Sequence, residues 1–238
     1  MEMSGCVAVI TGAGSGFGRE FARLGAARAM KLVLADINQE ALDATVQEMQ
    51  DAGVEVIGVR TDVSKAEQVQ ALADAAMARF GAVHLLFNNA GVGSGGFVWE
   101  STDADWQWVM GVNVWSVIHG IRIFTPLMLA HGEPAHIVNT ASAAGLISAP
   151  NMGIYNVSKH AVVALSETLH QDLTLVGANI GVSVLCPAFV PTGIAQSHRN
   201  RPSSWPTPRR RRPRCSAAQQ ASVKAVESGR ISAPRWRR

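Results

Sequence analysis

The chain has 238 residues, 47% of them apolar, which is enough to bury the core of one α/β domain. It has three cysteines, no basic residue before Arg19 and no apolar run near the ~20 residues that cross a bilayer, so we expect a cytoplasmic protein rather than a secreted or membrane-spanning one. Charge is concentrated at one end: residues 199–238 hold 12 of the 21 Lys and Arg residues and one of the 18 acidic residues, which leaves an acidic body.

Apolar runs bounded by turn residues alternate with longer amphipathic segments. Strands are expected at 6–11, 31–36, 54–62, 83–91, 135–142 and 180–188, and helices at 16–30, 38–53, 64–81, 103–131 and 152–176. Asn38 and Ser64 are expected N-caps, and Gly53 and Gly81 are expected to end their helices. Strands rich in Val, Ile and Leu without polar alternation belong in a parallel sheet covered on both faces. The pattern predicts a doubly wound α/β fold of the Rossmann type.

The stretch TGAGSGFG, residues 11–18, lies where the first expected strand meets the first helix. Gly12 permits a tight turn, Gly16 lets the backbone approach a pyrophosphate, and Gly18 lets helix and strand pack closely. A glycine-rich turn without a ligand is the alternative interpretation. The position of the loop between a strand and a helix favours dinucleotide binding.

The second expected strand ends at Asp36, and this residue indicates which dinucleotide binds. A carboxylate there can accept hydrogen bonds from both adenosine ribose hydroxyls and would repel a 2′-phosphate. Neither Ser15 nor Ile37 supplies the cation that a phosphorylated ribose requires. The expected cofactor is therefore NAD rather than NADP.

Several separated motifs follow the glycine loop in a fixed order. NNAG occupies residues 88–91, Asn113 lies in the long helical region, Ser142 ends the fifth expected strand, and YNVSK occupies residues 155–159. With TGxxxGxG at residues 11–18, this set resembles the classical short-chain dehydrogenases/reductases over about residues 4–194. The resemblance implies a nicotinamide-dependent oxidoreductase in one catalytic domain, residues 1–198.

Tyr155 and Lys159 are four residues apart and so lie on one face of a helix. The pair could be a partly exposed helix face, but Ser142 at a strand end favours a site. The ordinary pKa of a phenol is ~10, and an adjacent ammonium is expected to lower it. The resemblance implies that Tyr155 exchanges the proton of the substrate oxygen, Ser142 hydrogen-bonds that oxygen, Lys159 also holds the nicotinamide ribose, and Asn113 anchors a water-linked proton path to Lys159.

The resemblance also implies a wider set of cofactor contacts, while the seven histidines show no metal-ligand clustering. The family usually has glycine at the position of Ala188, which leaves the path of that loop uncertain. The expected cofactor-binding residues are Gly12, Ser15, Gly16, Phe17, Gly18, Asp36, Ile37, Asp62, Val63, Asn89, Ala90, Gly91, Tyr155, Lys159, Pro187, Val190 and Thr192.

Apolar stretches at residues 91–101 and 147–153, with the segment after Thr192, are expected to shape the substrate pocket. They favour a neutral, moderately hydrophobic secondary alcohol or ketone over an anionic substrate. The aromatic residues Phe97, Trp99 and Trp106 are as compatible with a core or an interface as with a pocket. Apolar residues on several faces of the helices bearing Asn113 and Tyr155 suggest a homodimer or homotetramer, as in the family.

Residues 199–238 form a basic tail in which WPTPRRRRPRC, residues 205–215, cannot form the helical lid that the family places there. If GC-rich codons are chosen for parts of this tail and are read in another reading frame, they encode ordinary enzyme sequence. The leading hypothesis is therefore that the tail is a frame-slipped remnant of the lid and C-terminal region, with the last strand altered or missing. A solvated tail and a nucleic-acid-binding arm are the alternatives, and nucleic acid is not the expected partner. A scrambled lid also leaves open a cofactor-binding protein with little turnover.

Overall fold

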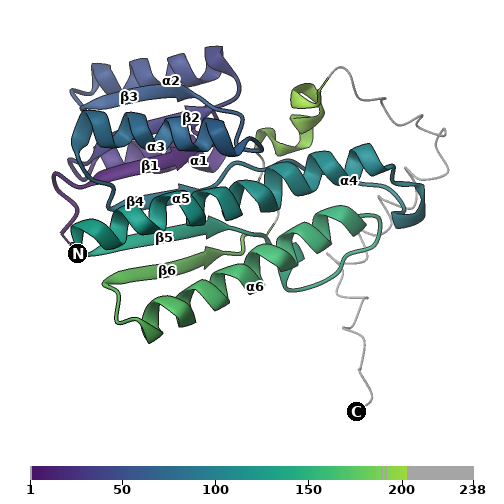
Figure 1. Ribbon diagram of the computed structural model, residues 1–238. Helices are drawn as coiled ribbons and strands as arrows, with labels where there is room; N and C mark the ends of the chain where they lie inside the picture. Colours follow the sequence, from purple (N-terminus) through teal and green to yellow (C-terminus); the bar gives the residue numbers. More distant parts are fainter. Residues whose placement is uncertain (1, 189, 191, 203–238) are drawn as a thin grey trace.

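The computed structural model describes residues 2–188, 190 and 192–202. Its six strands form one parallel sheet in the order β3-β2-β1-β4-β5-β6 (Figure 1). The strands are β1 (Val7–Thr11), β2 (Lys31–Asp36), β3 (Val56–Arg60), β4 (Leu85–Asn88), β5 (Ala135–Thr140) and β6 (Ile180–Leu185). The order reverses between β1 and β4, and such a switch point opens a crevice at the carboxyl ends of the strands. The predicted Rossmann-type fold is confirmed.

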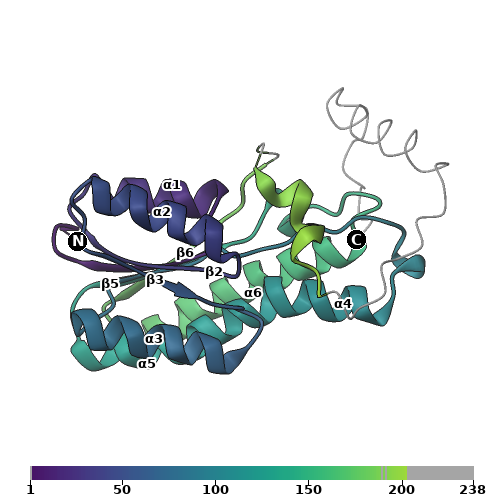
Figure 2. The same cartoon turned by 90° about the horizontal axis from the view of Figure 1, so that it is seen from above.

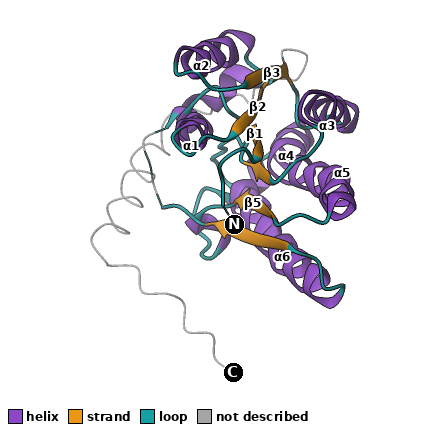
Figure 3. Ribbon diagram, turned by 90° about the vertical axis from the view of Figure 1, so that its left-hand side faces the viewer, coloured by secondary structure: helices purple, strands orange, loops and turns teal. Residues whose placement is uncertain are grey.

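Helices cover both faces of this sheet (Figures 2 and 3). The α-helices are α1 (Gly16–Ala26), α2 (Gln39–Asp51), α3 (Ala66–Phe80), α4 (Asp103–Met110), α5 (Ser116–His131) and α6 (Gly153–Leu175). Shorter helical segments are η1 (Val98–Glu100), η2 (Gly111–Trp115), η3 (Ala143–Gly145) and η4 (Gly193–Asn200). α1 and α2 lie on one face, while α3, α5 and α6 lie on the other. The sheet is therefore the central layer of three.

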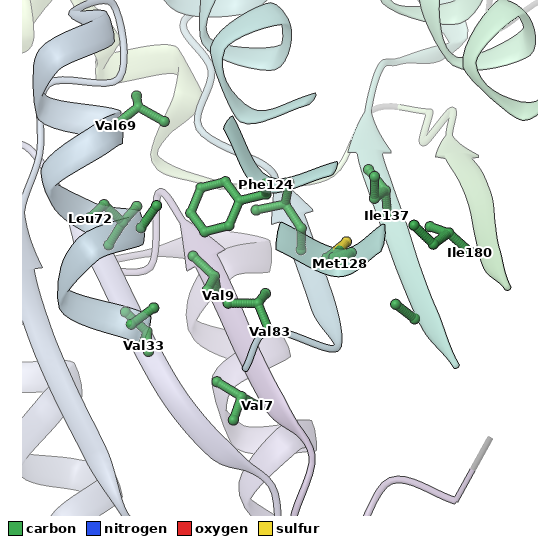
Figure 4. Packing of buried hydrophobic residues seen from close by; sticks show 14 of the residues in the cluster. Val7, Val9, Val33, Val69, Leu72, Val83, Phe124, Met128, Ile137 and Ile180 are labelled. Atoms are coloured by element: carbon green, nitrogen blue, oxygen red, sulfur yellow. The ribbon is translucent and has the colours of Figure 1, made fainter. Parts of the chain in front are cut away.

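Two apolar cores join these layers. On one face, Phe124 of α5 and Leu72 of α3 are fully buried against Val9 and Val33 of the central strands (Figure 4). On the other face, Ile10 and Leu34 pack with residues of α1 and α2. Val, Ile and Leu fill both sides of the same strands, which is why these strands show no polar alternation. This rigid centre fixes where the carboxyl ends of the strands lie.

Helix ends follow the sequence signals with one exception. Asn38 caps α2 by accepting a hydrogen bond from the Ala41 amide (3.1 Å), and Gly81 ends α3 in the left-handed conformation, as predicted. The prediction that Ser64 caps α3 is wrong, because Lys65 occupies the N-cap position. The amide and hydroxyl of Ser64 instead donate to the Asp62 carboxylate, at 3.0 and 2.7 Å. A local turn has taken the hydroxyl that would have capped the helix.

The expected long helix at residues 103–131 is divided by a π-helical stretch, η2, between α4 and α5. By length and composition, the region Asp103–His131 could cross a bilayer. Arg122 interrupts it, so it contains no unbroken apolar run of that length. In the structure Phe124 and Met128 are fully buried in the core, so this is the packing of a core helix.

The first residues of the expected basic tail are part of the described structure. Asn200 ends η4, and the Arg201 side chain contacts α4 through Asp105. The Arg/Pro block, the expected loss of the last strand and the frame-slip hypothesis concern residues 203–238, which lie outside the described residues. The domain boundary at residue 198 stays a prediction.

Candidate active site

The glycine loop joins β1 to α1 and has the backbone geometry of a phosphate cradle. Gly12 and Gly16 have positive φ angles of 67° and 53°, which side-chain-bearing residues rarely adopt. A Cβ atom at Gly18 would lie 2.1 Å from the Gly12 carbonyl oxygen, so only glycine lets α1 pack this closely on the loop. The Ser15 side chain makes no capping hydrogen bond, and the first turn of α1 contains no acidic residue. The amides at the start of α1 are therefore suited to an anionic ligand such as a pyrophosphate.

Asp36 is held in place by two backbone amides. Its Oδ2 accepts a hydrogen bond from Gly14 (2.9 Å) and its Oδ1 accepts one from Asn38 (2.9 Å). The carboxylate therefore lies directly beside the glycine loop, where an adenosine ribose bound to that loop would sit. Arg60, which pairs with Asp36 across β2 and β3, turns its Nε to the Ile37 carbonyl at 3.2 Å. In the sequence, Ser15 and Ile37 are the candidate neighbours of this carboxylate, whereas strand pairing adds Arg60.

Thr11, the first residue of the TGxxxGxG motif, ties the carboxyl ends of β1 and β4 together, although it is not among the expected cofactor-binding residues. Its Oγ1 accepts hydrogen bonds from the amides of Asn89 (2.9 Å) and Ala90 (3.1 Å), and the Asn89 side chain donates to the Thr11 carbonyl (3.0 Å). A Cβ atom at Gly12 would lie 2.9 Å from the Ala90 Cα atom. The glycine loop and the NNAG stretch therefore form one wall of the crevice. The available signal for Thr11 was its position directly before Gly12 at a strand end.

Tyr155 lies near the start of α6, and its phenol lies close to the side chain of Ser142, which follows β5. Tyr155 is only 8% exposed. Burial raises the pKa of the phenol, and the interaction with the Ser142 side chain partly opposes this shift. The Ser142 Oγ also accepts a hydrogen bond from the Ala144 amide (3.2 Å), which orients the hydroxyl. The two side chains predicted to meet the substrate oxygen are adjacent.

Lys159 lies one turn further along α6 and is almost completely buried, with 2% of its surface exposed. Its Nζ donates to the Thr140 carbonyl (2.8 Å) and lies 5.7 Å from the centre of the Tyr155 ring. Burial lowers the pKa of Lys159 to about 8. The sequence suggested that this ammonium governs the pKa of Tyr155. In the chain by itself burial outweighs it, and the pKa of the phenol is raised.

Asn113 is buried within the π-helical stretch η2 and makes three hydrogen bonds. Its Oδ1 accepts from the Val92 amide (2.8 Å), while its Nδ2 donates to the Val92 carbonyl (3.0 Å) and to the Ser158 Oγ (3.0 Å). The wider π turn interrupts the regular α-helical register at this residue. A Cβ atom at Gly91 would lie 3.5 Å from the Asn113 Oδ1 and 3.6 Å from the Lys159 Nζ. Gly91 therefore lies close to both the Asn113 side chain and the Lys159 Nζ, the two groups that the predicted proton path connects.

Residues 6–203 match the family model described as short chain dehydrogenase. The chain belongs to this family. A crystal structure of a short chain dehydrogenase/reductase from Burkholderia phymatum in complex with NAD is 60% identical, with a TM-score of 0.90, and the match covers 98% of this chain and 83% of that one. The CLA biosynthesis dehydrogenase/reductase of Lactiplantibacillus plantarum is 39% identical over 202 residues, which are 85% of this chain and 71% of that protein. The 1-deoxy-11-beta-hydroxypentalenate dehydrogenase of Streptomyces exfoliatus is 36% identical over 202 residues, which are 82% and 71% of the two chains.

The other expected contacts of this short-chain dehydrogenase differ in exposure. Val63 is buried, whereas Ile37 and Val190 are exposed. Thr192 faces the glycine loop, because a Cβ atom at Gly16 would lie 3.3 Å from its Cβ atom. The φ angle of Ala188 is not positive. An alanine therefore fits the backbone at this position, where the family usually has glycine.

Apolar side chains border the approach to Tyr155. A bridge between Gly96 and Met152 joins the loop after β4 to the start of α6, and Phe97 stacks on Trp99 with ring centres 4.7 Å apart. Trp99 is 76% exposed, so it is not a core residue of this chain. Trp106, by contrast, packs against the buried cluster of α4 and α6. Within the described part of the chain, no three His, Cys, Asp or Glu side chains are grouped to hold a metal ion.

Proposed function

We propose that this short-chain dehydrogenase catalyses NAD-dependent interconversion of a neutral, moderately hydrophobic secondary alcohol and its ketone. The observation that carries the proposal is that Ser142 and Tyr155 lie close together with the buried Lys159 beside them, at the carboxyl edge that also bears the glycine loop. Bound NAD would accept or return the hydride. The protein would move the accompanying proton and stabilise charge on the reacting oxygen.

The surroundings of the site residues support the roles that the family resemblance implies. Because burial raises the pKa of Tyr155, its phenol holds its proton at neutral pH and can donate it to a ketone oxygen. The Ser142 hydroxyl would donate to the same oxygen as negative charge develops there. Lys159 would hold the ribose hydroxyls and stabilise the phenolate left after proton donation, and Asn113 would anchor the water-linked path that returns the proton. Formation of NADH over a panel of secondary alcohols tests the activity, and its absence with every alcohol would contradict it.

The residues around Asp36 support NAD as the cofactor, and the NAD complex of the Burkholderia phymatum relative agrees with this choice. We expect NADH to bind at least about tenfold more tightly than NADPH, since two negative groups would otherwise meet at the ribose. Asp36→Asn removes the negative charge and should reduce the difference in affinity between NADH and NADPH, because Arg60 then lies near the 2′-phosphate without a competing carboxylate. Fluorescence titration with both dinucleotides measures the ratio.

A matched control for this change is Asp43→Asn, because Asp43 is an exposed acid on the neighbouring helix α2 and accepts a hydrogen bond from Gln39. It removes the same charge without touching the glycine loop. The ratio of NADH to NADPH affinity should stay at the wild-type value in this variant. Equal affinity of the wild-type protein for the two dinucleotides would contradict the assignment.

Exposed apolar residues near the site support the proposed substrate class. Leu146 and Ile147 follow η3 directly, and both are more than half exposed. The stretches 91–101 and 147–153 contain no Lys, Arg or His, so they offer an anionic substrate no cationic side chain. A cytoplasmic location stays a prediction from the cysteine content, with Cys6 and Cys186 both free thiols.

We further propose that the chain forms homodimers or homotetramers through α5 and α6. Trp115 is 51% exposed, and Leu129 of α5 and Val157 of α6 are also exposed, which leaves apolar surface on both helices. Trp115→Glu should place a charge in this surface and shift the protein toward monomers. Light scattering at micromolar concentration measures the mass. A monomeric wild-type protein would contradict the proposal.

A further inference from the structure

A shielded ion pair joins α4 to the segment that follows β6. The Arg201 Nη1 lies 2.5 Å from the Asp105 Oδ1, and the two side chains are only 10% and 12% exposed. The Arg201 guanidinium also lies over the ring of Trp108, 5.4 Å from its centre. Exposed ion pairs contribute little to stability, but a pair shielded from water is costly to break from one side, because the remaining charge is then left without its partner.

The Asp105 carboxylate is held in place by bonds other than the one to Arg201. Its Oδ2 accepts hydrogen bonds from the amide (2.9 Å) and the hydroxyl (2.7 Å) of Thr102 in a capping box that begins α4, and this leaves Oδ1 for Arg201. Burial alone would raise the pKa of Asp105, but the bonds from Thr102 and Arg201 lower it, so the carboxylate is charged at neutral pH. Arg201 therefore docks on a rigid, negatively charged point of the helix.

The segment of residues 192–201 lies beyond the carboxyl ends of the strands, where η4 is drawn in yellow-green (Figure 2). At its start, Thr192 faces Gly16 of the glycine loop. In its middle, the Ser197 Oγ accepts a hydrogen bond from the Gly93 amide (2.9 Å), two residues after Gly91. At its end, Arg201 is held by Asp105 on α4. The segment thus passes from one side of the crevice to the other, and the ion pair secures its far end.

We propose that Asp105 and Arg201 form a latch that holds residues 193–200 closed over the crevice, which makes both of them positioning residues for the reaction. The inference rests on the proposed function, because closure is useful where water must be excluded and the two ligands retained. Neither residue touches the reacting atoms. The latch acts by keeping Ser197 and Thr192 against the two loops that border the cofactor.

Arg201→Gln tests the latch, because it removes the charge and keeps a polar side chain. Hydrogen exchange of the amides in residues 193–200 should become at least about tenfold faster, since the segment opens more often. The rate of NADH release should rise at least about tenfold. It is measured by the loss of NADH fluorescence after displacement. The KM for the alcohol should rise by about tenfold or more, with kcat changed by less than about threefold, because the groups that perform chemistry are untouched.

Arg199→Gln is the matched control, because Arg199 lies in the same segment, is exposed, and has no ion pair among the described residues. This variant should behave as the wild type in exchange, NADH release and KM. Equal effects of the two substitutions would show that net charge rather than the latch is responsible, and would overturn the proposal. Wild-type exchange and release in Arg201→Gln would overturn it as well.

The partner residue supplies a second test. Asp105→Asn should reproduce the effects of Arg201→Gln, and the double variant should be no worse than either single variant, because both remove one interaction. Additive effects in the double variant would count against a latch. Arg201→Lys keeps the charge and should restore part of the wild-type behaviour, which also covers failure of the glutamine variant to fold.

Exchange and NADH release do not require turnover, so these measurements separate the latch from the proposed activity. A protein that binds NADH, oxidises no alcohol and still shows the Arg201 effects would contradict the proposed function alone. A protein that turns over normally in Arg201→Gln, with wild-type exchange and release, would contradict the latch alone.

Discussion

Replacing Tyr155 with phenylalanine is expected to lower kcat by a factor of about 10² to 10⁴, the usual contribution of a positioned proton donor or acceptor. Phenylalanine keeps the buried ring near Lys159 and loses only the hydroxyl that lies close to Ser142. NADH affinity should stay within about twofold of the wild type, because no contact with the glycine loop changes. Steady-state oxidation of a secondary alcohol and NADH fluorescence titration measure the two quantities. Turnover within tenfold of the wild type, a barrier change below ~1.4 kcal/mol, would contradict the assignment.

Tyr155 is the only tyrosine in the chain, which makes its protonation state directly observable. The absorbance change of phenolate formation therefore reports this one residue. Because burial raises the pKa of Tyr155, titration of the protein without cofactor should give a pKa above the ordinary value for tyrosine. The Phe variant should show no such absorbance change. A wild-type pKa below the ordinary value would show that the charge of Lys159 outweighs burial, as the sequence suggested.

Replacing Lys159 with methionine is expected to lower turnover and to raise stability at neutral pH. Turnover should fall by about a hundredfold or more, because the phenolate left by proton transfer loses its neighbouring ammonium. Stability should rise because burial lowers the pKa of Lys159 from 10.5 to about 8, so the folded protein carries a buried charge at pH 7. At ~1.4 kcal/mol for each pKa unit, the gain in the free energy of unfolding is at most of order 3 kcal/mol, reduced by the Thr140 carbonyl that loses its donor.

The pH dependence of this gain has a defined sign. Between pH 8 and 10.5 the unfolded chain binds more protons at Lys159 than the folded chain does, so wild-type stability rises with pH across that window. The advantage of the methionine variant is therefore largest below pH 8 and disappears as the pH approaches 10.5. Chemical denaturation at several pH values measures it.

Lys65→Met is the matched control for the lysine change, because Lys65 is exposed at the start of α3. Its stability relative to the wild type should not change with pH in this window. A Lys159→Met protein that is less stable than the wild type at pH 7 would show that the hydrogen bond to Thr140 outweighs the buried charge. Retained turnover in that variant would remove Lys159 from the site.

The sequence was sufficient to predict the fold and to propose the main members of the site, because both depend on local signals. Alternation of Val-rich runs with amphipathic segments is set by the periods of strands and helices, and parallel strands bring their carboxyl ends to one edge. Gly12 and Gly18 are required by backbone contacts that no other residue permits. The i, i+4 spacing of Tyr155 and Lys159 places them on one helix face wherever the helix lies.

Other features depend on contacts between residues distant in the chain, and only the tertiary structure determined them. The raised pKa of Tyr155 results from burial, which spacing along the sequence does not reveal. Arg60 becomes a neighbour of Asp36 through strand pairing, and Asn113 gains its partners Val92 and Ser158 through packing of the π-helical stretch. The docking of Arg201 on Asp105 joins residues 96 positions apart, and in the sequence Arg201 is one of many arginines in a basic tail. Local periodicity sets the elements, but burial and pairing set the charge and partners of each side chain.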